Sequence, residues 1–329
     1  MGNEKQKEVT FELDQIKGLG DVSIAKLNTL GIYNIKDLAV AGSADIATIL
    51  EKSQEWASTL VMSAHNFLKD NNVIGKDFRT AREYALLEKK RKKIKTGVES
   101  LDELLGGGIE TCSITEFYGK FGSGKSQICF TLSVLTALPE EQGGLDGNTL
   151  YIDVEGTFSA IRIEGIISER KLDPDIIDKI IVVRPDSASM LEYITKELSR
   201  VVEENNIKLI VVDSIIMLHR QEYMGRGNLA PRQQRLSAMM NKLLKIAETY
   251  NIAVVITNQI SSDPGANPLF QEVDHATGGN VIAHASSHRI RLERAGKKIK
   301  AKMIDSPRLS NSECQFMLNE RGVDRFVAK

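Results

Sequence analysis

A glycine-rich segment, Gly119–Ser126, has the residue types needed to bind the phosphates of a nucleotide. Its sequence, GKFGSGKS, fits the pattern G-x-x-x-x-G-K-[ST] at every fixed position. An apolar segment that predicts a strand (113–118) precedes it and an apolar helical segment follows it, and this context makes the motif specific. Glycines let main-chain N–H groups turn toward a phosphate, and the helix N-terminus adds partial positive charge. Lys125 then supplies a cation for the β- and γ-phosphates, and the Ser126 hydroxyl is a ligand for Mg²⁺.

Acidic residues end two of the predicted strands and extend this site. Asp213 follows the apolar run 207–212, at the carboxyl end of a strand where α/β sheets bind ligands, and can hold Mg²⁺ through water. Asp153 and Glu155 end the strand 149–154 and can polarise a water molecule. We favour Glu155 as the base, although strand alternation alone does not separate it from Asp153. The simpler alternative for each acid is that it caps the next helix.

Short β-branched apolar segments alternate with amphipathic helical segments from about residue 94 onward. The expected strands are 113–118, 149–154, 179–184, 207–213 and 252–258. Several are apolar on both faces, as in a parallel sheet covered on both sides. Such alternation predicts an α/β fold with a mostly parallel twisted sheet built from right-handed crossovers. The segments HRIRLER and AKMIDS, joined by AGKK, predict an antiparallel extension at the edge of the sheet.

The first 70 residues form a different kind of segment. Seven Lys and Arg residues against ten Asp and Glu residues give 7 − 10 = −3, and no strand-length apolar run occurs. Short helical patterns separated by Gly-centred turns predict a small helical domain over 1–70. The next segment, 71–95, reads as a basic linker, since 76–95 holds nine basic and three acidic residues, net +6. The predicted third segment is the α/β core, 96–329.

Composition excludes several other classes of protein. The 329 residues carry 43 Lys and Arg against 44 Asp and Glu, which rules out a wholly basic nucleic-acid coat. Three well-separated cysteines, Cys112, Cys129 and Cys314, argue against a disulfide framework and a paired-cysteine zinc site. No apolar N-terminal stretch resembles a signal peptide, and no apolar run has the length of a membrane span. We expect a cytoplasmic protein with no membrane partner.

Two segments have the character of nucleic-acid contacts. Residues 220–235 carry four arginines and one glutamate, net +3. Gly225, Gly227 and Pro231 argue against a regular helix before about Gln233. A basic irregular loop suits phosphate contact, while a solvated surface loop is the simpler alternative. The segment 261–279 contains two Pro and three Gly over nineteen residues, a length that is usually functional or disordered. Its last two glycines, Gly278 and Gly279, would let main-chain N–H groups approach a phosphate.

Several motifs in order along the chain resemble the RecA/Rad-type strand-exchange recombinases, above all their archaeal members. They are LDELLGGGIETCSITEFYGKFGSGKSQ, LYIDVEGTF, LIVVDS, EYMGRGNLAPRQQRL and ITNQI, and the resemblance spans about residues 18–322. The N-terminal LDQIKGLGDVSIAKL is similar to the helix–hairpin–helix domain that precedes the core in this family. The resemblance therefore implies a RecA-like P-loop ATPase core behind a small all-α helix–hairpin–helix domain.

The resemblance also assigns roles to individual residues. Nucleotide binding is implied for Gly119, Lys120, Phe121, Gly122, Ser123, Gly124, Lys125, Ser126, Gln127, Arg162 and His284. Ser126 and Asp213 match the magnesium positions, and Glu155 matches the glutamate that activates water. Gln259 matches a glutamine that links the γ-phosphate to the second DNA-binding loop, and His284 a nucleotide-sensing histidine near the protomer interface. DNA contact is implied for Arg220, Tyr223, Arg226, Arg232, Gly278 and Gly279.

Phe78 and Ala81 resemble the F-x-x-A motif, whose Phe and Ala enter pockets on an adjacent core in this family. The implied partners are single- and double-stranded DNA, recombination mediators and further copies of the chain, in a helical filament or a ring. The implied cofactors are ATP and Mg²⁺, and the implied place is the archaeal nucleoid. This chain departs from the family pattern at 159–161, leaving only Arg162 near the adenine, and at Ala276 and Thr277.

Three functions fit this pattern. The first is a DNA-dependent ATPase that exchanges homologous DNA strands in recombinational repair. The second is an ATP-binding mediator that exchanges no strands, which Glu155, both DNA segments and the Phe78 motif disfavour. The third is a hexameric helicase or regulatory ATPase of the same fold, which the helix–hairpin–helix segment and the basic loop 220–235 disfavour.

Overall fold

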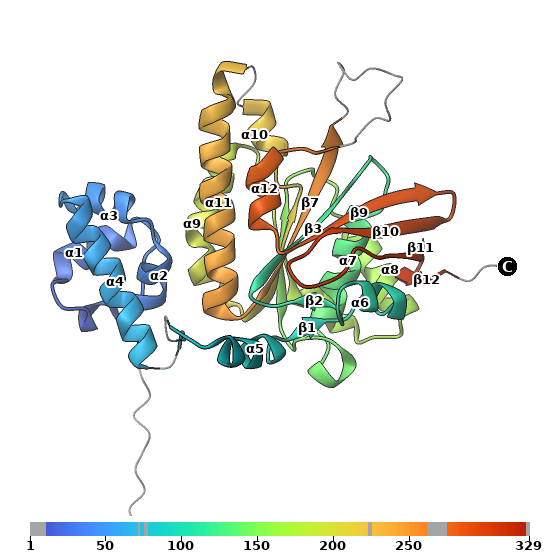
Figure 1. The fold of residues 1–329 in the computed structure, drawn as a ribbon, viewed down its shortest axis with the longest axis horizontal. Helices are drawn as coiled ribbons and strands as arrows, with labels where there is room; N and C mark the ends of the chain where they lie inside the picture. The colour runs from blue at the N-terminus through green and yellow to red at the C-terminus, as the bar shows by residue number, and fades with distance from the viewer. Residues whose placement is uncertain (1–10, 72, 76–77, 223–225, 262–274, 327–329) are drawn as a thin grey trace, which may run out of the picture. The chain divides into compact units, whose positions relative to one another are not determined.

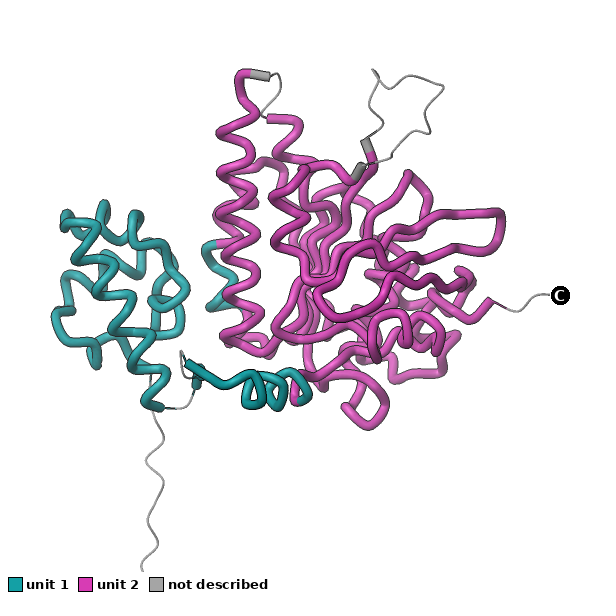
Figure 2. The backbone as a smooth tube through the Cα atoms, viewed as in Figure 1, with its two compact units in different colours: residues 1–89, 196–201 teal, residues 90–195, 202–329 magenta. Residues whose placement is uncertain are grey.

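The computed structural model describes residues 11–71, 73–75, 78–222, 226–261 and 275–326. The chain divides into two compact units, shown in different colours in Figure 2. Unit 1 comprises residues 1–89 with 196–201, and unit 2 comprises residues 90–195 with 202–329. The boundary between Lys89 and Lys90 falls inside the segment 71–95 that the sequence analysis assigned to a linker.

Unit 1 is helical in its described part, as its composition predicts. Its elements are η1 (Leu13–Gln15), α1 (Asp21–Asn28), α2 (Ile35–Val40), α3 (Ser43–Leu50), α4 (Gln54–Asp70) and α5 (Ala81–Lys89). Apolar side chains from η1 and α1–α4, among them Leu27, Ile46 and Leu68, form one buried cluster. Asn34 begins α2 with a capping box, since its side chain accepts from Asp37 N and the Asp37 carboxylate accepts from Asn34 N.

The predicted helix–hairpin–helix segment consists of η1, a turn and α1. Gly18 in the turn has a φ of 99°, and a Cβ built there meets no atom within 4 Å. Gly20 precedes the first residue of α1, Asp21. The helix α5 lies within the predicted linker, and none of its side chains is buried.

Unit 2 contains the α/β core. Its strands are β1 (Lys93–Ile94), β2 (Ile109–Glu110), β3 (Ser113–Gly119), β4 (Asn148–Asp153), β5 (Ile180–Val183), β6 (Ile207–Asp213), β7 (Ala253–Ser261), β8 (His275–Ala276), β9 (His288–Ala295), β10 (Lys298–Asp305), β11 (Glu313–Asn319) and β12 (Gly322–Arg325). Its α-helices are α6 (Glu99–Leu104), α7 (Lys125–Thr136), α8 (Ala160–Glu169), α9 (Ala188–Glu204), α10 (Met217–Glu222), α11 (Leu229–Tyr250) and α12 (Gly279–Ala285). Three short 3₁₀ helices are η2 (Glu140–Gln142), η3 (Pro174–Lys179) and η4 (Arg226–Asn228).

The main sheet has the order β12-β11-β10-β9-β3-β7-β6-β4-β5, and β8 pairs with β7 outside this path. Neighbours from β9 to β5 run parallel, and β10, β11 and β12 continue the sheet by antiparallel pairing. The predicted fold class is confirmed, including all five expected strands and the β9–β10 hairpin. The strands β11 and β12 and the two-residue strands β1, β2 and β8 were not predicted.

Helices cover the parallel strands on both faces, which explains why these strands are apolar throughout. The helix α7 packs against β3, β4, β6 and β7, while α11 packs against β3 and β7 from the other side (Figure 1). Every residue of β3 is buried. Because β3, β4, β6 and β7 are parallel, their carboxyl ends meet at one edge of the sheet, where the predicted phosphate-binding and acidic residues lie. Among the described residues, none of the helices is both long and apolar enough for a bilayer crossing.

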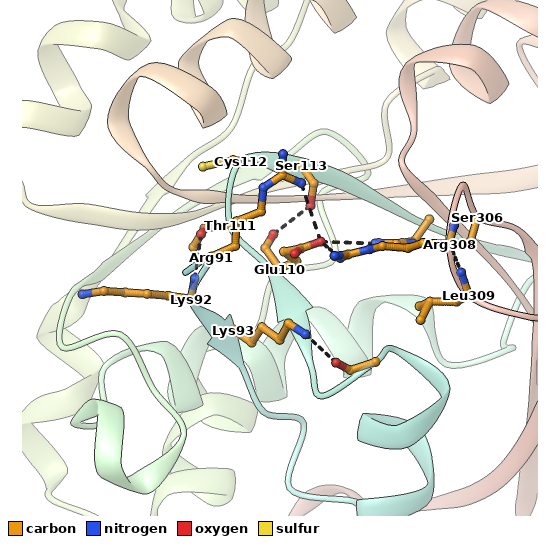
Figure 3. A network of polar contacts seen from close by, with 12 residues as sticks. Arg91, Lys92, Lys93, Glu110, Thr111, Cys112, Ser113, Ser306, Arg308 and Leu309 are labelled. Atoms are coloured by element: carbon orange, nitrogen blue, oxygen red, sulfur yellow. Dashed lines mark hydrogen bonds and ion pairs between the residues drawn. The ribbon is translucent and has the colours of Figure 1, made fainter. Parts of the chain in front are cut away.

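A buried carboxylate ties the start of unit 2 to the rest of the core (Figure 3). Glu110 in β2 is 1 % exposed, and its Oε2 atom accepts from Arg308. Arg91 Nη1 lies 3.9 Å and His288 Nε2 3.6 Å from the same oxygen. Arg91 lies two residues before the start of β1, which pairs with β2. Glu110 is therefore the negative centre of a cationic cluster.

Replacing Glu110 by glutamine is expected to destabilise unit 2 by about 3 kcal/mol. Removing one partner of a buried ion pair costs about 3–5 kcal/mol, and the lower end applies because the Arg308 side chain is 31 % exposed. Denaturant unfolding followed by circular dichroism measures the loss. Trp56, the only tryptophan, lies in α4 of unit 1, so its fluorescence transition should stay in place.

The matched control is Glu313→Gln, because Glu313 forms an exposed ion pair with Lys300 at 2.8 Å. An exposed pair contributes about 0–1 kcal/mol. Equal destabilisation by the two substitutions would contradict a special role for the Glu110 cluster.

Candidate functional site at the carboxyl edge of the sheet

The segment Gly119–Ser126 joins β3 to α7 in a conformation that depends on glycine. Gly122 and Gly124 have φ values of 73° and 99°, and Gly124 precedes the first residue of α7. A Cβ added to Gly119 would lie 2.4 Å from the main-chain oxygen of Leu292. The main-chain N–H groups at the start of α7 have no helical acceptor. This arrangement is the anion-binding turn that the motif predicts.

The Lys125 side chain lies inside this turn and binds its main chain. Its side chain is largely buried, and Nζ donates to the main-chain oxygens of Gly119 and Lys120, both at 3.1 Å. Burial lowers the pKa of Lys125, while the carboxylates of Glu155 and Asp213 oppose this shift. The loop residue Phe121 is 96 % exposed. A triphosphate at this turn would therefore meet a cation already held in place.

Asp213 ends β6 and is completely buried. Its Oδ2 atom accepts from Tyr151 Oη at 2.7 Å, and its Oδ1 atom accepts from Thr257. Burial raises the pKa of Asp213, and the hydroxyls of Thr257, Tyr151 and the nearby Ser126 oppose that shift. The structure thus brings together Ser126 and Asp213, the two residues predicted to hold magnesium. A hydroxyl and a carboxylate oxygen are ligands that suit this ion.

The structure distinguishes the two acids that follow β4. Asp153 is 2 % exposed, and its carboxylate accepts from the main-chain N–H groups of Thr157 and Phe158 at 2.9 and 3.2 Å. Arg184 Nε lies 3.8 Å from the same carboxylate. Glu155 instead accepts from Gln259 Nε2 at 2.9 Å. Asp153 stabilises the turn after the strand, and Glu155 is directed toward the end of β7.

Gln259 connects this carboxylate to the second predicted DNA segment. Its main-chain oxygen accepts from both the N–H and the hydroxyl of Thr277, each at 2.9 Å. The next residue, Ile260, pairs with Ala276 in the β7–β8 ladder. Asn258 strengthens the junction, since its buried side chain donates to Thr277 O at 2.6 Å and to Glu116 at 2.8 Å. A displacement of Gln259 would therefore move the residues at both ends of the segment between β7 and β8.

Residues 262–274 of that segment lie outside the described residues. Gly278, which immediately precedes the first residue of α12, has a φ of 94°, and Gly279 has a φ of 60°. A Cβ on Gly279 would meet no atom within 4 Å. The main chain at Gly279 is thus accessible, as the predicted phosphate contact requires.

The first predicted DNA segment, residues 220–235, is more helical than its sequence predicts. Regular structure was not expected before about Gln233, but α10 extends to Glu222 and α11 begins at Leu229. That expectation was wrong because Pro231 lies in the first turn of α11, where its missing N–H costs no helical hydrogen bond. Arg220 is exposed at the end of α10, and Arg232 is half-buried in α11. Arg226 begins η4, and Tyr223 lies outside the described residues.

Arg162 has protein partners for its guanidinium. Its Nε donates to Gln127 Oε1 at 2.8 Å, its Nη1 to Glu320 O at 3.0 Å and its Nη2 to Asn319 O. Arg162 therefore joins α7 to the turn between β11 and β12. Its predicted adenine contact would use the planar face of the guanidinium. His284 is exposed in α12, and its predicted nucleotide-sensing role stays a prediction.

The predicted self-association motif is exposed. Phe78 is 94 % exposed, and Ala81, the first residue of α5, is also exposed. A large exposed aromatic side chain next to a helix start is a candidate anchor for another protein surface.

Comparison with known proteins gives the family. The Rad51 family model matches residues 88–326. The chain belongs to the Rad51 family. It is 44 % identical over 315 residues to a protein of Cenarchaeum symbiosum named DNA repair and recombination protein RadA, covering 95 % of this chain and 79 % of that relative. It is 40 % identical over 316 residues to the protein of that name from Ignicoccus hospitalis, covering 94 % of each chain. The predicted resemblance to RecA/Rad-type proteins is confirmed.

Sequence reasoning missed several residues of this Rad51-family site. Tyr151 and Thr257 bind Asp213, Asn258 joins Glu116 to Thr277, and Thr277 had counted only as a departure from the family pattern. Asn258 had a visible signal, a polar residue that ends an apolar strand. For Tyr151 and Thr257 no such signal exists, because both lie inside strands whose side-chain contacts depend on the neighbouring strand.

Proposed function

We propose that this protein is a DNA-dependent ATPase that assembles on single-stranded DNA and exchanges homologous strands in recombinational repair. Membership of the Rad51 family and similarity to two proteins named for DNA repair and recombination support this function. The observation that carries it is the Glu155–Gln259 hydrogen bond of 2.9 Å. Gln259 thereby joins the carboxylate proposed for catalysis to the start of the segment proposed to contact DNA.

The chemistry follows from the residues at the sheet edge. Lys125 and the N-terminal turn of α7 bind the phosphates of ATP, and Ser126 with Asp213 would hold Mg²⁺, which neutralises phosphate charge when bound. Glu155 orients a water molecule and accepts its proton. Gln259 holds Glu155 in position and senses the γ-phosphate. Because Thr277 is bound to Gln259, the state of the nucleotide changes the segment that contacts DNA.

Binding rather than hydrolysis would drive DNA pairing in this mechanism. A ligand shifts an equilibrium only by its differential affinity for the two states. ATP would favour the DNA-binding state through Gln259, and hydrolysis would remove that bias and release DNA. The arginines of residues 220–235 would supply the phosphate contacts and a steep dependence on salt.

A strand-exchange assay with the full chain tests this function directly. We expect joint molecules between homologous single- and double-stranded DNA with ATP or a non-hydrolysable analogue, and none without nucleotide. Electron microscopy of the same samples should show helical filaments. ATP binding without joint molecules would instead favour a mediator, and closed rings on DNA would favour a helicase.

Self-association through the linker gives a second prediction. Phe78→Ala should raise the concentration needed for filament formation at least about tenfold, because burying a phenylalanine contributes about 2–3 kcal/mol. The fold should be unchanged, since Phe78 is 94 % exposed in the single chain. Light scattering against protein concentration measures the effect. Met62→Ala, an exposed apolar residue of α4 at 56 %, is the control, and an equal shift in both variants would contradict the motif assignment.

A further inference from the structure

A histidine lies completely buried beside the first DNA segment. His219 belongs to α10 and is 0 % exposed. Neither of its ring nitrogens has a hydrogen-bond partner among the described residues. A buried polar group without a partner destabilises a fold, and an apolar aromatic ring would fill the same space without that cost. This imidazole therefore requires an explanation beyond packing.

Charged groups from three helices act on the charge of this imidazole. Glu192 comes from α9, Glu222 from α10, and Arg232 and Arg235 from α11. Arg235 Nη1 forms an ion pair with Glu192 Oε1 at 2.6 Å, and Glu222 accepts from the main-chain N–H of Ala188. Arg232 differs from Arg235, because its buried Nε atom has no partner among the described residues.

The balance of these groups favours the neutral form of His219. Burial lowers the pKa of His219 below its ordinary value of 6.5, and the two arginines add to this effect. Glu192 and Glu222 favour the protonated form without overcoming that effect. A weaker field from the arginines would therefore shift the balance toward the imidazolium.

Bound DNA would favour the protonated form of His219. A phosphate of the DNA backbone that pairs with Arg232 or Arg220 neutralises positive charge next to His219 and adds negative charge. An opposite charge nearby favours the protonated form of a histidine. The pKa of His219 is therefore higher when DNA is bound than when it is absent.

We propose that His219 is a positioning residue of the DNA-binding segment that takes up a proton when DNA phosphates approach the arginines of α10 and α11. The inference rests on the proposed function, because it requires DNA phosphates at these arginines. The protonated ring would attract the carboxylates of Glu192 in α9 and Glu222 in α10 and hold α10 against α9 in the DNA-bound state. By linkage, a ligand that raises the pKa of a group binds more tightly as the pH falls.

The affinity for a fluorescent oligo-dT strand, measured at several pH values with a non-hydrolysable ATP analogue, tests the proposal. Between about pH 8 and about pH 6, the wild-type affinity should rise about threefold to tenfold more than that of His219→Phe, since one proton limits the slope to about tenfold per pH unit. His219→Phe should fold normally, because the ring nitrogens lose no hydrogen bond. His219→Gln is a second variant that lacks a titrating ring.

Calorimetry in buffers of different ionisation enthalpy gives a readout that a purely structural role would not change. Wild-type protein should take up protons on binding the oligonucleotide, and both His219 variants should take up fewer. His65→Gln, a histidine substitution in α4 of unit 1, should match the wild type. Equal proton uptake in wild type and both variants would overturn the proposal. Failure of the wild type to bind the strand at any pH would instead contradict the proposed function itself.

Discussion

Replacing Lys125 by alanine is expected to weaken ATP binding at least about a hundredfold and to abolish strand exchange. A charged hydrogen bond contributes about 1.5–3 kcal/mol, and this cation would contact two phosphates. In the structure Nζ already lies inside the turn, 3.1 Å from each of two main-chain oxygens. Equilibrium titration with a fluorescent ATP analogue measures the affinity, and joint-molecule formation measures the activity.

The control for this substitution is Lys245→Ala. Lys245 is an exposed lysine of α11, so its removal tests the loss of one positive charge away from the turn. The ATP affinity and the yield of joint molecules should both stay within about twofold of the wild type, because surface substitutions change little. If Lys125→Ala kept full nucleotide affinity, the assignment of the whole sheet edge would be wrong.

Glu155→Gln should reduce DNA-dependent ATP hydrolysis about a hundredfold to ten-thousandfold while leaving ATP affinity nearly unchanged. General-base catalysis contributes about this factor, and glutamine keeps the shape of the side chain without its basicity. Filaments should then persist in ATP, since hydrolysis no longer releases DNA. Phosphate release and filament lifetime on single-stranded DNA measure the two effects.

Asp153→Asn provides the comparison that separates the two acids. Asp153 accepts two main-chain hydrogen bonds and lies near Arg184, so its substitution should lower the free energy of unfolding by about 1–3 kcal/mol. Its hydrolysis rate per folded molecule should fall less than that of Glu155→Gln. The reverse order of the two rates would move the role of the base to Asp153.

The chemistry at the sheet edge was predictable because it depends on local order along the chain. A strand, the eight-residue motif Gly119–Ser126 and a helix specify the turn around Lys125, and an acid at the end of a buried strand specifies Asp213. Strand alternation could not separate Asp153 from Glu155, since both acids follow the same strand two residues apart. The main-chain N–H groups of Thr157 and Phe158, which bind Asp153, and the amide of Gln259, which binds Glu155, distinguish the two carboxylates.

The remaining errors and omissions concern contacts between distant parts of the chain. Pro231 looked like a barrier to a helix, but its position in the first turn of α11 depends on where η4 ends. The adenine contact of Arg162 stays a prediction, but local sequence did not indicate that its donors reach residues 157 and 158 positions later in the chain. The burial of His219 results from the packing of α10 against neighbouring helices, and no local pattern indicates it.

The β7–β8 ladder has a consequence for the evolution and engineering of this core. Ser261 and His275 are partners in an antiparallel register, so the anchor points of the intervening stretch stay fixed whatever its length. Doubling the length of a flexible insertion there would cost only about 0.6 kcal/mol in closure entropy. Under the proposed function, exchange of residues 262–274 between relatives should therefore change the DNA contact and leave the nucleotide-binding residues of the sheet edge in place.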